Sequence, residues 1–201
     1  MSPSTLTALP PLVSADTRLL VLGSFPGLAS LQAQQYYGHP RNHFWPIMEA
    51  LLPASPQNTG ASSYHNRSEW LLRHKIGVWD VYAACDREGS LDSDIRNAVL
   101  NDFSMLKMRC PDLQAVVHNG AESFRHSKYV IDSLVGEGVA ARRDGPPLAS
   151  AAPSGGSVLH EVKSMEVHFH KLPSTSPANA SWSFERKLAA WREVFEKYGL
   201  V

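Results

Sequence analysis

The chain has 201 residues, 19 Lys and Arg against 19 Asp and Glu, and 43% hydrophobic residues. A chain of this length buries about 70% of its extended surface on folding, which favours one compact domain. Because the formal net charge is zero, a nucleic-acid partner would have to be bound by local groups rather than by a polybasic surface. Two cysteines are too few for an all-cysteine iron–sulfur cluster, and we expect both Cys85 and Cys110 to be reduced.

The N-terminal segment, residues 1–17, is rich in Ser, Thr, Pro and Ala without clear periodicity, which predicts a flexible leader. It shows no basic start followed by an apolar stretch. The longest aliphatic runs, such as residues 19–22, are far shorter than the roughly 20 residues of a membrane span. We therefore expect a cytoplasmic monomer without membrane contact, whose single domain occupies residues 18–201.

The hydrophobic pattern alternates between short apolar runs and helical periodicity. The apolar runs predict strands at residues 18–23, 76–81, 114–119 and 165–170. Helices are expected at residues 43–52, 66–74, 93–109 with a break near residues 101–102, 120–134 and 181–198. Residues 144–157, composed mainly of Gly, Pro, Ala and Ser, predict a flexible loop. The alternation predicts an α/β fold: a three-layer α/β/α sandwich around a four-stranded, mostly parallel sheet.

Ligands of such sheets bind beyond the carboxyl ends of the strands, so the residues that follow the strands are functional candidates. The first strand leads into residues 23–27, GSFPG, a turn that brings backbone N–H groups close to the crevice. These residues match neither a nucleophile elbow, nor a P-loop, nor a dinucleotide fingerprint, and a simple tight turn is the alternative. Asp80 and Asn119 end the second and third strands, so we expect both at the same edge.

Residues 36–45, YYGHPRNHFW, combine four aromatic residues with two histidines, an arginine and an amide. Aromatic faces beside polar donors suit a pocket that stacks a planar heterocycle and hydrogen-bonds to its edge. The alternative is a well-packed helix entrance, in which Pro40 sets the turn and Asn42 caps the helix. On the decapeptide alone, neither interpretation prevails.

The fourth strand runs into residues 172–181, LPSTSPANAS, just before the terminal helix. Hydroxyl groups and free N–H groups at a helix start suit contact with phosphate. The alternative is a loop that is shaped by its prolines and capped by Ser181.

In this order, GSFPG, YYGHPRNHFW and LPSTSPANAS resemble the uracil-DNA glycosylase superfamily and are most similar to its hypoxanthine-DNA glycosylase branch, often called family 6. The resemblance covers roughly residues 18–135 and 165–200. It implies a three-layer α/β/α enzyme that flips a deaminated base, preferably hypoxanthine, out of DNA and hydrolyses its N-glycosidic bond. The implied partner is DNA that contains deaminated bases.

The resemblance also implies roles for individual residues. The working amide of the His-Pro-x-Asn segment falls on Asn42, and Phe44 falls where the family stacks an aromatic ring on the extruded base. Many relatives carry a catalytic Asn or Asp where this chain has Ser24, and the loop after the fourth strand lacks the leucine that several relatives insert into DNA. The expected catalytic residues are Asn42 and Ser24; base-binding residues are Phe25, Pro26, Gly27, Phe44, Asp80 and Asn119; DNA-binding residues are His39, Arg41, Ser174, Thr175, Ser176, Pro177 and Asn179.

Cleavage of a glycosidic bond places positive character on the sugar and negative charge on the departing base. An amide is no general base near neutral pH, so Asn42 is expected to orient water and to polarise. Backbone N–H groups of residues 24–27 could hold a base carbonyl, and Asp80 could accept the N1–H that hypoxanthine has and adenine lacks. The motifs place no lysine to form an imine, which predicts a monofunctional enzyme that leaves an abasic site.

Three alternatives stay open. Within the same family the preferred substrate could be uracil or another deaminated base. The chain could instead be a non-catalytic DNA-lesion binder, because Ser24 replaces the commoner catalytic residue and the net charge is zero. It could also act on free nucleobases or nucleosides. In every case we expect no metal ion and no cofactor, because the histidine pairs at residues 39 and 43 and at 168 and 170 lack the surroundings of a metal site.

Overall fold

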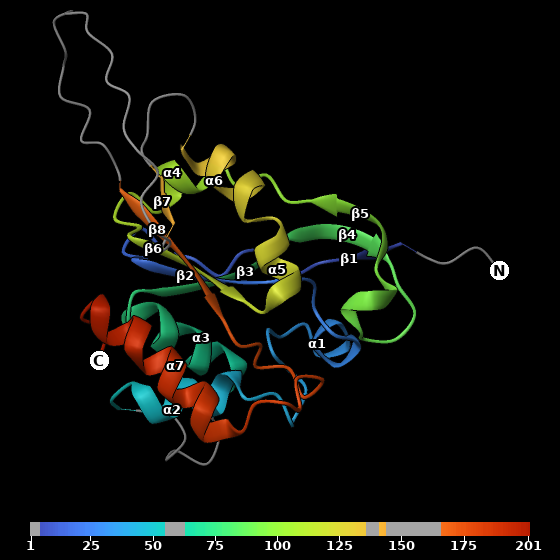
Figure 1. The fold of residues 1–201 in the computed structure, drawn as a ribbon, viewed down its shortest axis with the longest axis horizontal. Helices are drawn as coiled ribbons and strands as arrows, with labels where there is room; N and C mark the ends of the chain where they lie inside the picture. The colour runs from blue at the N-terminus through green and yellow to red at the C-terminus, as the bar shows by residue number, and fades with distance from the viewer. Residues whose placement is uncertain (1–4, 55–62, 136–140, 144–165) are drawn as a thin grey trace, which may run out of the picture.

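The computed structural model describes residues 5–54, 63–135, 141–143 and 166–201. Its main sheet has five parallel strands (Figure 1). In spatial order these are β3 (Ile76–Asp80), β2 (Leu19–Gly23), β6 (Ala115–Asn119), β8 (Val167–Leu172) and β7 (Ala141–Arg143). The expected flexible loop at residues 144–157 lies outside the described residues.

The four predicted strands are confirmed, because the central strands are buried on both faces and therefore show as continuous apolar runs. Every residue of β2, β3 and β6 is buried. The short edge strand β7 was not predicted, since its sequence Ala-Arg-Arg has no apolar run. All strand carboxyl ends lie at one edge, where Gly23 stands opposite Asp80, and Asn119 opposite Leu172.

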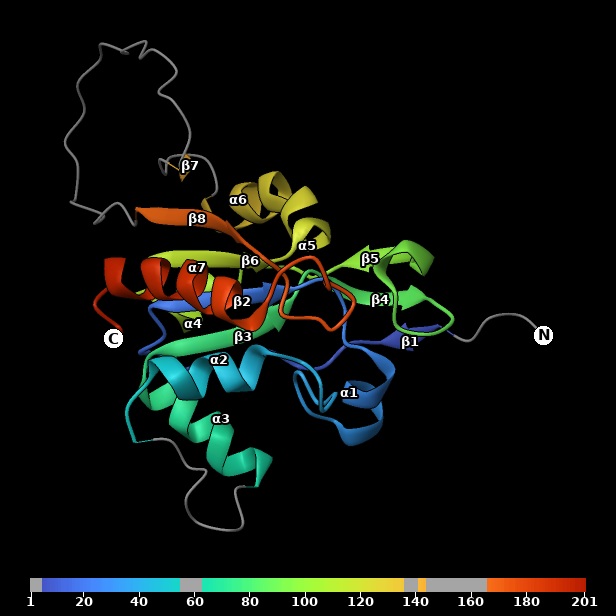
Figure 2. The same ribbon diagram turned by 60° about the horizontal axis from the view of Figure 1, so that its bottom comes forward.

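Helices cover both faces of this sheet, which gives the three expected layers (Figures 1 and 2). One layer contains α2 (Phe44–Leu51), α3 (Tyr64–Arg73) and α7 (Phe184–Lys197). The other contains α4 (Leu106–Arg109), α5 (Ala121–Arg125) and α6 (Ser127–Val135). The predicted apolar stripe of the terminal helix faces the core, where Trp191 and Phe195 are fully buried.

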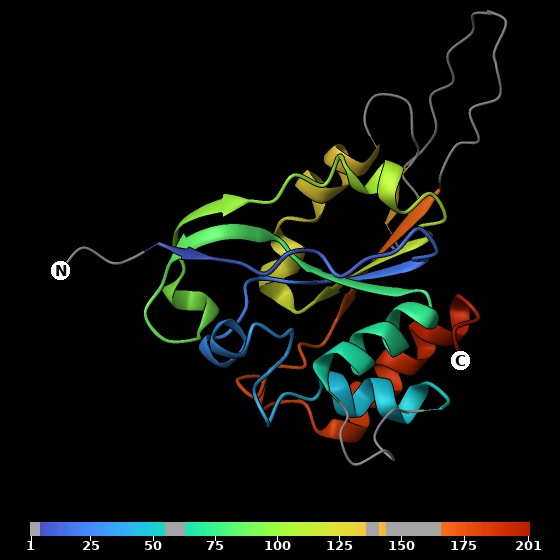
Figure 3. The same cartoon turned by 180° about the vertical axis from the view of Figure 1, so that it is seen from behind.

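A second, antiparallel sheet extends from the first and was missed by the sequence pattern (Figure 3). Its strands are β1 (Leu6–Thr7), β4 (Tyr82–Asp86) and β5 (Arg96–Leu100) in the order β1-β4-β5. The predicted helix over residues 93–109 is therefore wrong: a short 3-10 helix (Asp92–Asp94) precedes β5, and only α4 is helical thereafter. Pairing with β4 overrides the local pattern, because β5 is largely exposed and has no buried stripe to reveal it.

The N-terminal segment is part of the fold, so the expected flexible leader is wrong for residues 5–17. Strand β1 pairs with β4, and Leu12 exchanges backbone hydrogen bonds of 2.9 and 2.8 Å with Val78. Leu9 is buried in the core. Residues 1–4 lie outside the described residues. The prolines of this segment therefore do not indicate a disordered chain. They lie in an extended segment that pairs with two strands.

Two expectations from composition can be compared with the described residues. Cys85 and Cys110 are free and buried, as expected of reduced cysteines. Among the helices that the structure describes, none combines the length and the apolar character needed to cross a membrane.

We predict that Leu9→Ala lowers the free energy of unfolding by about 2–4 kcal/mol, because it leaves a cavity between the N-terminal segment and the core. Denaturant-induced unfolding measures the change. Leu91→Ala is the matched control: its side chain is 53% exposed, so its effect should stay within about 0.5 kcal/mol. Equal effects of the two substitutions would instead support the prediction that the N-terminal segment is a flexible leader.

Candidate active site

A cavity of about 390 Å³ opens at the carboxyl edge of the parallel sheet. This is within the range of roughly 300–1,000 Å³ for pockets that hold small ligands. It lies where the strand order reverses, since the chain passes from β2 to β3 on one side and then to β6 on the other. It is lined by residues 23–27, 29–30, 90–93 and 174–179, by Tyr36, Tyr37, His39 and Asn42, and by the strand ends Asp80 and Asn119. The motifs that the sequence singled out thus meet in one place.

Residues 23–27, called loop 23–27 below, form one wall of the cavity. A Cβ at Gly23 would collide with the Asp80 carboxylate, so only glycine fits at this point. Phe25 is almost buried, and the guanidinium of Arg87 lies 4.9 Å from its ring centre and donates to the carbonyl oxygen of Pro26. Within the described residues, the backbone N–H groups of Phe25 and Gly27 have no hydrogen-bond partner. Loop 23–27 is therefore a fixed wall with free donors.

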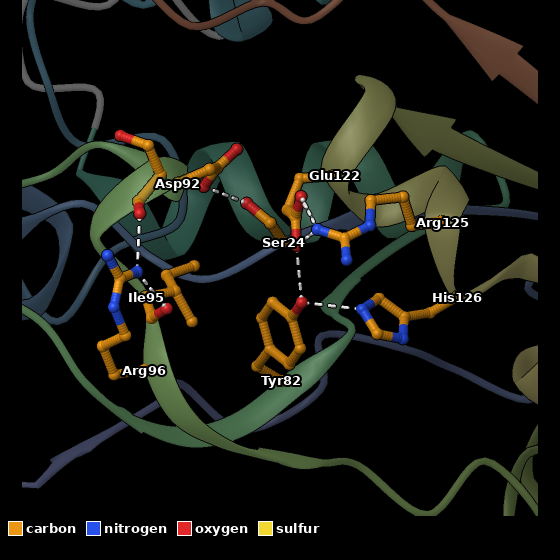
Figure 4. Close-up of polar contacts among 9 residues, drawn as sticks. Ser24, Tyr82, Asp92, Ile95, Arg96, Glu122, Arg125 and His126 are labelled. Atoms are coloured by element: carbon orange, nitrogen blue, oxygen red, sulfur yellow. Dashed lines mark hydrogen bonds and ion pairs between the residues drawn. The ribbon is translucent and has the colours of Figure 1, made fainter.

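Ser24, in the same wall, forms a hydrogen bond with a carboxylate that the sequence analysis did not single out. Its hydroxyl donates to Asp92 Oδ1 at 2.7 Å (Figure 4). Its carbonyl oxygen accepts from the backbone N–H of Tyr82 at 3.0 Å. The hydroxyl of Tyr82 in turn lies 2.7 Å from both Glu122 and His126. Asp92 was missed because the contact joins residues 68 positions apart; a Gly-Ser-Leu-Asp-Ser run after a strand was the available signal.

Asn42 directly precedes His43, the N-cap of α2, so the prediction that Asn42 itself caps the helix is off by one residue; its side chain still bonds to the first turn and lines the cavity. Its Oδ1 accepts the backbone N–H of Phe44 at 2.9 Å, which fixes the first turn of α2. Its side chain is half-buried and lines the cavity. No described residue bonds to Nδ2. The amide therefore retains two N–H donors for a bound molecule.

Phe25, Tyr36 and Tyr37 line the cavity, whereas Phe44 does not, which corrects the prediction that Phe44 stacks on a base. Phe44 is fully buried and does not line the cavity. Tyr37 lines it and stacks on Phe44 with ring centres 4.0 Å apart. The backbone of Tyr37 is left-handed, with φ of 55°. The turn therefore places Tyr37 at the cavity, where the linear motif would place Phe44.

Asp80 is a buried carboxyl group at the floor of the cavity. The side chain is 3% exposed, and its Oδ2 has no hydrogen-bond partner among the described residues. Burial and, to a lesser extent, the charge of Asp92 raise the pKa of Asp80 to about 8, although the positive charge of Arg87 opposes the rise. At pH 7 about ten protonated groups exist for every ionised one. Asp80 is therefore a donor as well as an acceptor.

Asn119 connects the third strand to the loop that follows the fourth. Its Oδ1 accepts the backbone N–H of Thr175 at 2.9 Å, and its Nδ2 donates to Thr175 Oγ1 at 2.9 Å and to the Tyr37 hydroxyl at 3.2 Å. These bonds use both amide hydrogens. A base in the cavity could reach only the remaining lone pair of the oxygen, and base binding by Asn119 stays a prediction.

Residues 174–179, called loop 174–179 below, form the opposite wall and include the five expected DNA-binding residues of this segment. The backbone N–H of His43 donates to the carbonyl oxygen of Thr175 at 2.9 Å. From α7, the fully buried Lys187 donates to the carbonyl oxygen of Ser176 at 3.4 Å. The loop is thus held by two helices. Ser183, not Ser181, caps α7, since its hydroxyl oxygen accepts the backbone N–H of Arg186 at 3.3 Å.

The remaining expected contacts with DNA lie near the mouth of the cavity. His39 lines it, and its Nδ1 accepts the backbone N–H of Arg41 at 3.1 Å. Arg41 is exposed and outside the lining. In the part of the chain that the structure describes, no three His, Cys, Asp or Glu side chains gather as a metal site.

Comparison with known proteins assigns this architecture. Residues 10–195 match the family model described as Uracil DNA glycosylase superfamily. Two relatives named hypoxanthine DNA glycosylase, from Methanosarcina barkeri (strain Fusaro) and Methanosarcina acetivorans, are 43% and 39% identical over 114 residues, which is 57% of this chain and 70% of each relative. The solution structure of a proposed uracil DNA glycosylase from Methanosarcina acetivorans has a TM-score of 0.70 and 29% identity, with 96% of this chain and 98% of that chain covered. The chain belongs to the uracil DNA glycosylase superfamily.

Proposed function

We propose that this glycosylase removes hypoxanthine from DNA by hydrolysing the N-glycosidic bond of deoxyinosine. The observation that carries the proposal is the set of free groups in one cavity: the amide N–H groups of Asn42, the backbone N–H groups of loop 23–27 and the carboxyl of Asp80. A purine with a carbonyl beside a ring N–H is complementary to such a set. The names of the two Methanosarcina relatives support the same substrate.

The base is expected to lie between aromatic rings, with its carbonyl directed at loop 23–27. Phe25 and Tyr37 line the cavity and supply flat apolar surfaces. The free backbone N–H groups of Phe25 and Gly27 would donate to O6 of hypoxanthine. Adenine carries an amino group at that position, and two donors that face each other leave both without a partner. The fixed backbone thus selects a carbonyl.

Asp80 is expected to bind the adjacent ring N–H. Protonated, it can accept N1–H and donate its own hydrogen to O6. A protonated carboxyl can also pair with adenine by exchanging the donor and acceptor oxygens. Ionised, it can only accept, and adenine has no N1–H to give. Asp80 therefore contributes to base selection mainly above its pKa of about 8, whereas near neutral pH its main contribution is a donor.

The same donors support the chemistry. As the glycosidic bond breaks, negative charge spreads over the departing purine, and donors already in place stabilise it without reorganisation. A carboxylic acid kept neutral by burial is suited to this task. Asn42 orients the attacking water through its amide hydrogens. The residues that line the cavity include no lysine, so no imine with the sugar is formed there, and the product is an abasic site.

We expect the enzyme to remove hypoxanthine from labelled duplexes that contain inosine. The strand should then break at the abasic site only after alkaline treatment. Parallel duplexes with uracil, xanthine and T·G mismatches establish the preferred base. Preference for uracil would keep the family and change the substrate. Tight binding without alkali-sensitive sites would indicate a lesion-binding protein, and hydrolysis of free inosine would indicate a nucleoside enzyme.

We predict that Asn42→Ala lowers the single-turnover excision rate by about 100-fold or more, comparable with the loss of one preorganised donor. Asn42→Asp is the sharper variant. Its carboxylate can still accept the backbone N–H of Phe44 and so keep this hydrogen bond at the start of α2, but it has no amide hydrogens.

Thermal unfolding and excision are measured on both variants. Asn42→Asp should unfold near the wild-type temperature and be as inactive as Asn42→Ala. Wild-type rates in a folded Asn42→Asp protein would mean that this side chain only stabilises the start of α2 and takes no part in catalysis.

Asp80→Asn should change how stability depends on pH. Between about pH 4 and about pH 8 the folded wild type keeps a proton on Asp80 that the unfolded chain has released. Wild-type stability therefore falls as pH rises through this window, by up to about 1.4 kcal/mol per pH unit. The variant lacks this titration, so its stability should increase relative to wild type from pH 4 to pH 8 and then run parallel.

Chemical denaturation at several pH values measures the difference. Asp86→Asn is the control with the opposite sign, because hydrogen bonds from Asn97 and Thr5 lower the pKa of Asp86, whose ionised form stabilises the fold as pH rises. In excision assays, wild-type preference for hypoxanthine over adenine should increase from pH 6.5 to pH 9, whereas that of Asp80→Asn should not. Parallel profiles would remove Asp80 from base selection.

A further inference from the structure

The segment between β4 and β5 reaches the cavity, although the sequence pattern gave it no function. Gly89, with φ of +75°, turns the chain, and Ser90, Leu91, Asp92 and Ser93 line the cavity next to loop 23–27. None of these four residues belongs to the motifs that carried the family resemblance.

Two hydrogen bonds hold this segment against loop 23–27 and the helix that follows it, α1 (Leu28–Ala33). The backbone N–H of Leu28 donates to Ser90 Oγ at 3.0 Å. The hydroxyl of Ser24 donates to Asp92 Oδ1 at 2.7 Å, as Figure 4 shows. The other oxygen of the carboxylate, Oδ2, has no partner among the described residues. One oxygen of Asp92 is thus fixed, and the other is free.

Among the described residues, Asp80 and Asp92 are the two acidic residues that line the cavity, and they differ in their access to water. Asp80 is enclosed and mostly protonated near neutral pH. Asp92 keeps solvent exposure at the mouth, where its carboxylate can contact a water molecule. A carboxylate is a general base in the sense that an amide is not, and Asn42 cannot accept the proton that hydrolysis releases.

We propose that Asp92 is the catalytic carboxylate that takes the proton of the attacking water, and that Ser24 positions it. This rests on the proposed glycosylase function. The bond between the sugar carbon C1′ and the purine nitrogen breaks, and its electron pair leaves with the purine. The water oxygen bonds to C1′, and one water proton passes to Asp92. That proton later neutralises the purine anion or passes to solvent, so atoms and charge balance.

Charged and titratable groups around Asp92 set the pH at which it ionises. Desolvation raises its pKa, the hydrogen bond from Ser24 lowers it, Glu122 of α5 raises it and Arg87 after β4 lowers it. Among the described residues, Asp80 of β3 and Tyr82 and Cys85 of β4 are the other titratable groups that sense its charge. The net shift is upward. Since the ionised form is the active base, excision should rise with pH through this ionisation.

The test is single-turnover excision of inosine by Asp92→Asn from pH 5 to pH 9. We expect a loss of about 100-fold or more at neutral pH, within the range for a lost general base, and disappearance of the acid limb of the profile. Binding to a duplex with a tetrahydrofuran abasic analogue should stay within about threefold of wild type. Asp94→Asn is the matched control: it removes the same charge from the same short 3-10 helix but from outside the cavity lining, and should stay within about threefold of wild type.

Each outcome decides between the two levels of the proposal. If Asp92→Asn retains wild-type rates and the acid limb while Asn42→Asp is inactive, Asp92 is not the base and the glycosylase function stands. If wild type excises no base at all, the function itself fails. Should Asp92→Asn not fold, Ser24→Ala replaces it: a loss of about tenfold with unchanged binding supports the positioning role, and an unchanged rate overturns it.

Discussion

The close approach of Gly23 to the Asp80 carboxylate is the contact on which the rest of the site depends. It exists because β2 and β3 run parallel in a register that sets the two residues side by side. With no room for a Cβ at Gly23, the Asp80 carboxyl is enclosed by backbone instead of water. Its pKa rises for that reason, and loop 23–27 leaves the sheet from the same point. The register of β2 against β3 thus determines both that Asp80 stays protonated and the direction in which loop 23–27 leaves the sheet.

The site divides its tasks among groups of different chemistry. In the proposed mechanism, backbone N–H groups and the neutral carboxyl of Asp80 would contact the base, the amide of Asn42 would contact the water, and the carboxylate of Asp92 would act as the base; all of these residues line the cavity. None of these groups needs a positively charged surface, which agrees with a chain of zero net charge. Loop 174–179, the opposite wall, has no charged side chain. Hydrogen bonds from Lys187 and Asn119 maintain its shape. In the proposed mechanism, selectivity would therefore come from enclosed hydrogen bonds rather than from electrostatic attraction.

Much of the fold was readable from the sequence because buried parallel strands leave continuous apolar runs, and their carboxyl ends carry the polar residues. Asp80 and Asn119 were placed at one edge for that reason, Asn42 was assigned to the site through the family resemblance, and all three line the cavity. The antiparallel sheet was missed because β5 is exposed and gains its structure from pairing with β4.

Errors within the site have equally local causes. Phe44 was assigned the place that Tyr37 occupies, since a left-handed residue in a turn rotates its neighbours in a way that linear spacing does not encode. Asp92 escaped notice because its partner, Ser24, is distant in sequence. A pattern search along the chain sees neither kind of relation, and both become evident only when segments meet in space.

The double use of the Asn42 side chain couples the chemistry to the integrity of one helix end. Its oxygen accepts the backbone N–H of Phe44 in the first turn of α2, and its side chain lines the cavity. Fraying of that turn would release the amide while the sheet and the core remained intact. On gradual heating, turnover should then cease some degrees before the global melt, so that inactivation records the loosening of a single helical turn.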